Sequence, residues 1–221
     1  MISPRNKAFH HISSSEELSG RKLEKNENMK HFFNRSITFI AILLASTQLS
    51  GQTVKVSVEP NHSTVGFVVK IAGGVTRVTG KFTDFALDMD YVDKDITKSS
   101  VLFTIEAASI NTGIDQRDAH LRTADFFDVE KFPQITFKSS AIRKKGEAYE
   151  MDGTFTMHGV SKEVTIPFEL TSTTGYPSAS IRWSLNREDY GIFFEHTTEK
   201  NFLSKQIGIE IDFWTRKSKK Q

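Results

Sequence analysis

From Thr53 onward, apolar and polar residues alternate along the chain with a period of two. This pattern predicts half-buried β-strands, because successive side chains of a strand point to opposite faces. The polar positions carry Thr, Ser, Lys, Asp and Glu, as expected for a face that meets water. About nine strands are predicted, at residues 54–58, 65–71, 85–91, 101–105, 135–137, 149–157, 164–170, 181–185 and 207–213.

Turn residues separate these runs. A Pro-Asn pair lies at 60–61, three small residues at 72–74 predict a flexible link, and hairpin turns are predicted within 144–147 and 157–163. Phe82 is out of step with the apolar row that starts at Phe85, and Gly80 lies just before it. This combination predicts a bulge or bend near Thr83.

Two stretches favour helix. In the first, "DQRDAHLRTADFF" at 115–127, Asp115 is a candidate helix cap and Asp118 lies in the first turn. The second is the short segment 186–191. The apolar edge of the first stretch, Leu121, Phe126 and Phe127, needs a hydrophobic surface, and both the mouth of a barrel and its outer wall would serve.

About nine strands with one apolar face each must bury that face in a sandwich or in a closed barrel. The inward rows are rich in phenylalanine. A closed eight-stranded barrel leaves an interior just wide enough for side chains or for one ligand. The aromatic rows are compatible with both, so a filled structural barrel without a ligand stays an alternative at this point.

The N-terminal region has the pattern of a targeting segment. A basic stretch follows Met29, and the apolar run 37–45 is far shorter than the roughly 20 residues that span a bilayer. Residues 29–51 are therefore predicted to be a signal peptide cleaved near Gly51, with a single-pass anchor as the alternative. Residues 1–28 are polar and patternless and are expected to be a non-native or disordered upstream extension. Residues 52–221 are expected to form one domain, periplasmic or secreted and without stable membrane insertion.

Charge and cysteine content narrow the function. Residues 52–221 carry 22 basic and 23 acidic side chains, so this part of the chain gives no electrostatic reason to expect nucleic-acid binding. The chain has no cysteine, which excludes disulfides, thiolate catalysis and thiolate metal sites.

The sequence offers little support for catalysis. The histidines beyond residue 51 are tens of residues apart, unlike the close pairs of zinc sites, and neither a nucleophile elbow nor a phosphate-binding loop is present. We predict no metal and assign no catalytic residue. A hydrolase or isomerase acting on a bound lipid is the competing class, and it would need a polar trio such as His62, His120 and a carboxylate. The four histidines are His62, His120, His158 and His196.

Five segments together resemble the YceI-like family of exported lipocalin-like barrels. They are "HSTVGFVVK", "GKFTDFALDMD", "SINTGIDQRDAHLRTADFFDVEKFPQITFKS", "YEMDGTFTMHGVSKEVTIPFEL" and "LNREDYGI", and the resemblance covers 54–213. It implies a closed antiparallel eight-stranded barrel with one short helical corner. Two features depart from the family pattern: Asn61 stands where Asp is frequent, and a more aromatic run follows residue 191.

The resemblance also implies a cavity for a polyisoprenoid, prenyl quinone or fatty-acyl lipid, without any other cofactor. Transport, storage and stress protection are open as roles, and the oligomeric state is open as well, with a homodimer among the alternatives. Polar side chains at the mouth would select the head group, although surface pairing with Asp118 and Glu188 is the alternative for the two arginines. The predicted ligand-binding residues are Phe67, Val69, Phe85, Phe103, Ile105, Phe126, Phe127, Phe137, Phe155, Phe168, Trp183, Arg117, His120 and Arg187.

Overall fold

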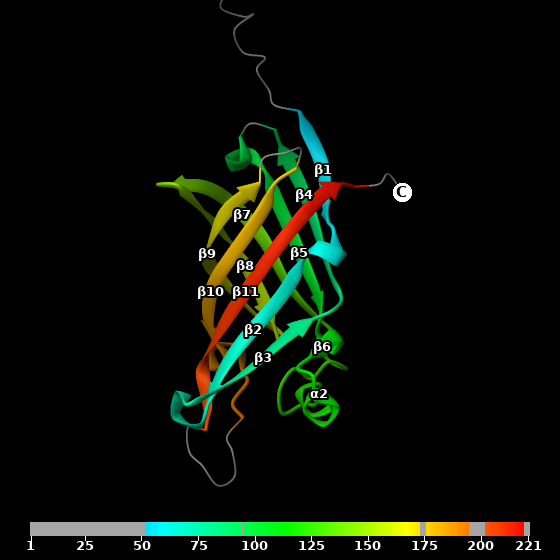
Figure 1. Ribbon diagram of the computed structural model, residues 1–221, viewed down its shortest axis with the longest axis vertical. Coiled ribbons are helices and arrows are strands. Elements are labelled where there is room, and N and C mark those ends of the chain that lie inside the picture. Colours follow the sequence, from blue (N-terminus) through cyan, green and yellow to red (C-terminus); the bar gives the residue numbers. More distant parts are fainter. Residues whose placement is uncertain (1–51, 94, 173–175, 195–201, 219–221) are drawn as a thin grey trace, which may run out of the picture. The chain divides into compact units, whose positions relative to one another are not determined.

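The computed structural model describes residues 52–93, 95–172, 176–194 and 202–218. Residues 1–51, with the predicted extension and signal peptide, lie outside this range. In the described residues, eleven strand segments form one antiparallel sheet that closes on itself by pairing β1 with β11 (Figure 1). The segments are β1 (Thr53–Val58), β2 (Thr64–Ile71), β3 (Thr76–Phe82), β4 (Phe85–Val92), β5 (Ser100–Glu106), β6 (Ile110–Asn111), β7 (Gln134–Lys145), β8 (Ala148–Met157), β9 (Val160–Ser172), β10 (Ser178–Asn186) and β11 (Leu203–Lys217).

The eleven segments make eight barrel strands. β1 and β2 pair with successive parts of the same edge of β11, so they form one strand interrupted by a 3₁₀ turn. β3 pairs with β2 while β4 pairs with β1, and β6 pairs with β3 while β5 pairs with β4. β3 and β4 therefore form one bent strand, and β5 and β6 form another. The predicted closed eight-stranded antiparallel barrel is confirmed.

The bend predicted near Thr83 is present, because β3 ends at Phe82 and β4 begins at Phe85. β3 itself was not among the predicted strands. Its inward row is Val78, Gly80 and Phe82, so a glycine interrupts the apolar alternation that a strand prediction depends on. β6 is only two residues long and leaves no pattern in the sequence.

The predicted link at 72–74 is present as a turn, and its flexibility stays a prediction. It is the 3₁₀ turn η2 (Ala72–Gly74), in which Ala72, Gly73 and Gly74 all have positive φ. The backbone N–H of Ala72 donates to the carbonyl of Phe202 just before β11 (2.9 Å), which joins the turn to the barrel.

Both predicted hairpin turns are present. The β7–β8 turn places Gly146 at φ +62°, and the β8–β9 turn places His158 and Gly159 at φ +51° and +76°. Two successive positive φ values are typical of the type I′ turns that join twisted antiparallel strands.

The predicted helical corner contains α2 (Asp115–Leu121). Ile114, and not Asp115, holds the N-cap position, and its side chain makes no cap hydrogen bond. The carboxylate that orders this corner is Asp118, which is buried and accepts from both the backbone N–H (2.9 Å) and the hydroxyl of Thr112. Asp115 remains exposed to solvent, so the cap prediction is wrong for this residue.

The second predicted helix is the 3₁₀ turn η5 (Arg187–Tyr190), capped by the side chain of Asn186 on the N–H of Glu188 (3.1 Å). The remaining 3₁₀ turns of the described residues are η1 (Pro60–His62), η3 (Ile96–Lys98) and η4 (Ala107–Ser109).

The turns divide between the two ends of the barrel. One end, drawn at the bottom of Figure 1, carries η2, α2, η5 and the β8–β9 turn, and we call it the α2 end. The other end carries the β7–β8 turn, the start of β1 and the last residues of β11 (Figure 1).

Candidate functional site

The barrel encloses a cavity of about 390 Å³. Its wall is built from the inward rows of the strands, and it is apolar almost throughout. This volume lies within the range of small-molecule sites, about 300–1,000 Å³. The polar side chains on the lining, apart from the Trp183 indole, are Arg117, His120, Arg187 and Thr215.

The cavity reaches the surface at the α2 end. His120 lines it, yet 47% of its side chain is exposed to solvent. Its Nε2 lies 2.9 Å from Oδ2 of Asp125, which holds the ring at the rim. At the opposite end, the lining residues Ile96, Pro177 and Thr215 are all buried. The barrel is therefore a cup with one open end.

Aromatic side chains surround this opening. The rings of Phe126 and Phe194 lie 4.6 Å apart between centroids, and the His120 ring is nearly perpendicular to both. Deeper in, Phe127 meets Phe82 edge to face at 5.8 Å. The apolar edge of the helical corner thus packs at the mouth of the barrel and not on its outer wall.

Thirteen of the fourteen predicted site residues line the cavity. As ligand-binding residues they stay predictions. The exception is Phe85, which lies outside the lining. Its ring packs beside Phe103 and Phe213 with centroid distances of 6.3 and 6.5 Å, so it contacts two wall residues of the cavity.

The two lining arginines are held by backbone and hydroxyl oxygens. Arg187 is buried, and it donates from Nη1 to the carbonyl of Ile192 (2.5 Å) and from Nε to the carbonyl of Ser204 (3.2 Å). Its contact with Glu188 is long, at 4.0 Å. Arg117 donates from Nε to Thr112 Oγ1 (2.7 Å) and from Nη2 to the carbonyl of Thr112 (2.9 Å).

Surface pairing is therefore not the main role of either arginine. Arg187 fastens η5 to β11, and Arg117 fastens α2 to the end of β6. Both guanidinium groups brace the open end of the cup, and His120 is the lining side chain that is most open to solvent.

The prediction missed several lining residues. Three methionines from β4 and β8, and aromatic residues from the segments on either side of 195–201, also face the cavity. The methionines already lay on the predicted inward rows, so their pattern was sufficient to find them. The aromatic residues carried one signal, the unusually aromatic run after residue 191. These residues are Met89, Met151, Met157, Phe194 and Phe202.

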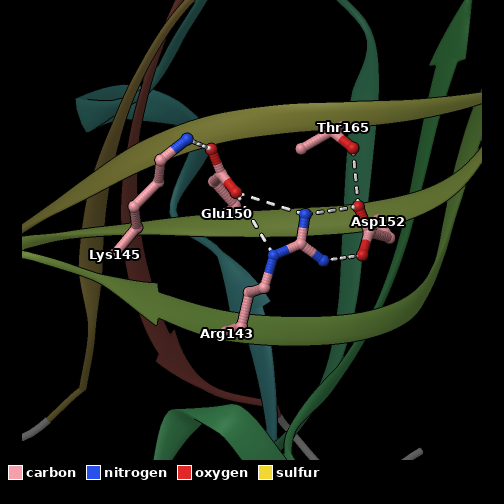
Figure 2. A network of polar contacts seen from close by, with 5 residues as sticks. All are labelled: Arg143, Lys145, Glu150, Asp152 and Thr165. Atoms are coloured by element: carbon pink, nitrogen blue, oxygen red, sulfur yellow. Dashed lines mark hydrogen bonds and ion pairs between the residues drawn. The ribbon is translucent and has the colours of Figure 1, made fainter.

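The outer wall over β7, β8 and β9 carries a polar network (Figure 2). Arg143 bonds both Glu150 (Nε to Oε2, 3.2 Å) and Asp152 (Nη2 to Oδ1, 2.9 Å), and Thr165 donates to Asp152 (2.6 Å). The hydrogen bond from Lys145, and then that from Arg143, holds the pKa of Glu150 below its ordinary value. The network lies outside the cavity and ties three strands together across their outer faces.

The trio that a lipid-acting enzyme would need is not brought together. His62 is exposed on η1 and faces the ring of Trp214 at 6.2 Å, outside the cavity that His120 lines. His196 lies outside the described residues. Within those residues, no group of three or more His, Asp or Glu side chains is placed to hold a metal ion. The same part of the chain contains no helix that is long and apolar enough to cross a membrane.

A closed eight-stranded antiparallel barrel around an apolar cavity, open at one end, defines the lipocalin-like class of barrels. Within this class the match is specific: residues 57–214 match the model of the YceI-like domain. The chain belongs to the YceI-like family.

Two relatives show the extent of the likeness. The UPF0312 protein of Serratia proteamaculans is 32% identical over 181 residues, which cover 79% of this chain and 92% of that protein. Protein YceI of Escherichia coli O6:H1 is 31% identical over 134 residues, which cover 61% of this chain and 70% of that protein.

Solved structures share the fold. The superposition on the crystal structure of Burkholderia cenocepacia BcnA covers 72% of this chain and 99% of the BcnA chain, with a TM-score of 0.66 and 21% identity. The Campylobacter jejuni YceI protein covers 66% and 88%, with a TM-score of 0.58 and 28% identity. A polyisoprenoid binding domain from Saccharophagus degradans, implicated in plant cell wall breakdown, covers 75% and 99%, with a TM-score of 0.59 and 13% identity.

Proposed function

We propose that this protein is an exported, soluble carrier that holds a long-chain amphipathic lipid inside the barrel. The ligand is a polyisoprenoid, a prenyl quinone or a fatty-acyl lipid. The observation that carries this proposal is the apolar cavity of about 390 Å³ in a barrel that is otherwise closed. A filled structural barrel would have no use for such a void, because protein interiors are normally close-packed.

The driving force would be transfer of the lipid tail from water to the wall of the cup. At about 0.8 kcal/mol per buried CH₂ group, a tail of about 15 carbons would gain about 12 kcal/mol. Ordering of the tail and loss of free translation offset a good part of this gain. Discrimination between tails would be weak, because one methylene group changes affinity little in an apolar site.

Head-group selection would take place at the open end. Arg187 and Arg117 each direct two donors to the protein's own oxygens. His120 is on the lining and 47% exposed, so it is the group best placed to meet a polar head.

The family, the cavity and a domain of the same fold described as polyisoprenoid-binding support the lipid as ligand. Export is supported by the pattern of residues 29–51 alone. N-terminal sequencing of the protein isolated from the periplasm tests it, and the expected first residue lies near Gln52. A start upstream of Met29 would contradict both the signal peptide and its cleavage.

The ligand is tested by purifying the protein from cells, extracting it with organic solvent and analysing the extract by mass spectrometry. We expect an isoprenoid or acyl chain in stoichiometric amount. An empty extract, together with no binding of an added prenyl quinone, would contradict the proposal. Turnover of an added prenyl ester that His120→Ala abolishes would instead identify a lipid-acting hydrolase.

A substitution of the wall gives a second test. Phe103 is buried on the lining, so Phe103→Asp would place a carboxylate in an apolar site and lower lipid occupancy or unfold the barrel. The control is Leu102→Asp, at the neighbouring exposed position on the outer face. Equal lipid occupancy in both variants would contradict the assignment of the inward face.

A further inference from the structure

The turn between β2 and β3 presents an apolar side chain directly to solvent. Val75, at its tip, is 89% exposed. The turn has positive φ values at 72–74, and the backbone N–H of Ala72 donates to the carbonyl of Phe202. A single exposed apolar side chain is common on a protein surface, so the exposure of Val75 points to a contact only together with the charges around it.

The hairpin that carries Val75 is positively charged. Between Pro60 and Thr83 the sequence contains Lys70, Arg77 and Lys81 but no acidic residue. Lys70 and Arg77 face each other directly across the β2–β3 ladder. Like charges in that position repel and destabilise the pair. Neither forms an ion pair with another residue of the described part of the chain, so an anion from outside would relieve the repulsion.

The hairpin tip lies at the open end of the cup. Ile114, before α2, and Phe193, after η5, are exposed at the same end by 52% and 66%. Val75, Ile114 and Phe193 are thus three separate exposed apolar side chains at this end. Three acidic residues at this end are already paired, in the contacts His120–Asp125, Lys162–Asp189 and Lys205–Glu188. Asp115 next to Ile114, and Asp128 and Glu130 after α2, are acidic as well, so the α2 side of this end is mixed in charge and the β2–β3 hairpin is its basic side.

We propose that the β2–β3 hairpin docks the open end of the barrel on a bilayer that contains anionic phospholipids. Val75 enters the head-group region, while Lys70 and Arg77 contact phosphate groups. Apolar side chains flanked by basic ones bind such surfaces through burial and electrostatic attraction combined. The inference rests on the proposed function, because a lipid ligand taken from a membrane would then enter the cavity without crossing water.

Vesicle sedimentation tests the charges. The variants are the double change Lys70→Gln with Arg77→Gln and a matched control, Lys138→Gln with Lys144→Gln, which removes two exposed charges from β7. With vesicles of phosphatidylcholine and phosphatidylglycerol, we expect the hairpin variant to bind about five-fold more weakly for each charge removed. The control should bind like wild type. All versions are purified after export and share the same N-terminus, so any contribution of that segment is common to them. Equal binding of both variants would overturn the proposal.

A site-specific probe tests the contact itself. Because the chain has no cysteine, Val75→Cys can be labelled at one position with an environment-sensitive fluorophore. The control is Glu147→Cys in the β7–β8 turn at the other end of the barrel. We expect a blue shift on addition of the anionic vesicles at position 75 and none at 147. Unchanged emission at position 75 would contradict insertion of the tip.

Lipid transfer separates this inference from the proposed function. The hairpin variant should take up a fluorescent prenyl lipid from anionic vesicles more slowly than wild type. Both should bind the same lipid equally when it is added from detergent. Equal uptake rates would overturn docking and leave the carrier intact, whereas no binding from detergent by any version would overturn the carrier. If wild type forms a dimer without vesicles and the hairpin variant a monomer, the hairpin is a contact between two copies, and membrane docking is wrong.

Discussion

Phe67 on β2 lies directly opposite Gly80 on β3, and its ring fills the space where any larger residue would place its Cβ. A Cβ at position 80 would lie 2.3 Å from Cζ of Phe67. Gly153 on β8 is covered in the same way by the ring of Phe137, and a Cβ there would also lie 2.3 Å from the carbonyl oxygen of Lys138. Two wall aromatics of the cavity thus pack on glycines of neighbouring strands.

These contacts predict different costs for two alanine substitutions. In Gly80→Ala the Phe67 ring can turn toward the cavity, so we expect a loss of about 1–3 kcal/mol, as for overpacked sites. Gly153→Ala should cost more, because a backbone carbonyl blocks the Cβ and the strand must move. Urea unfolding measures both.

Gly208→Ala is the control for this pair. The atoms nearest to its Cβ would be 3.7 and 3.8 Å away, an ordinary contact, so little change is expected. A Gly80→Ala variant as stable as Gly208→Ala would show that Phe67 does not pack on the glycine as described.

A cavity-filling substitution tests whether the barrel is hollow. Ile166 on β9 is buried and lines the cavity, whereas Val56 on β1 is buried but lies outside the lining. Ile166→Phe should leave the free energy of unfolding nearly unchanged, because the added atoms enter the void. Val56→Phe should lose about 1–3 kcal/mol in a close-packed region.

The same substitution should affect the ligand. Ile166→Phe reduces the space for a lipid tail, and we expect binding to weaken by at least about tenfold. Denaturant unfolding and titration with a fluorescent prenyl lipid measure the two effects. Equal destabilisation by Ile166→Phe and Val56→Phe would indicate a solid interior.

The sequence predicts the barrel wall well, because a strand with one buried face has an apolar residue at every second position, such as Phe103 and Phe155. It predicts β3 poorly, because the inward residue Gly80 leaves room for the ring of Phe67 on β2. That requirement is a contact between strands and leaves no local pattern.

The open end was the least predictable part. The roles of Arg187 and Arg117 depend on which carbonyl and hydroxyl groups lie within reach, and the neighbouring acidic residues suggested ion pairs instead. The sequence left open whether the helical corner packs at the mouth of the barrel or on its outer wall. The contact of Phe126 with Phe194 places it at the mouth, and Phe194 lies in a segment far away in the sequence.

The buried Arg187 gives a prediction about the stability of the open end of the barrel. Arg187→Gln removes the donors to the carbonyl groups of Ile192 and Ser204, which are then left without these partners. Hydrogen bonds of charged groups contribute about 1.5–3 kcal/mol, so we expect a loss of about 2 kcal/mol or more. Arg117→Gln should cost less, because Arg117 is only half-buried and water can replace its bonds to Thr112. Thermal unfolding compares the two, and a larger loss for Arg117→Gln would contradict the anchoring role of Arg187.

The network of Figure 2 gives a prediction about pH. The pKa of Glu150 is held below its ordinary value of 4.5, first by the hydrogen bond from Lys145 and then by Arg143. A carboxylate with a lowered pKa in the folded state binds protons less readily there than in the unfolded chain. Its contribution to stability is therefore complete above about pH 4.5 and is lost as the pH falls through the lowered pKa.

Arg143→Gln should accordingly destabilise the protein slightly at pH 7, and the difference from wild type should shrink below pH 4.5. The effect is small because the network is open to solvent and screened by salt. Urea unfolding at a series of pH values measures the difference, with Lys138→Gln as a control that removes an exposed charge on the same strand. A difference between Arg143→Gln and wild type that persists unchanged at pH 3 would mean that Arg143 acts by packing and not through Glu150 and Asp152.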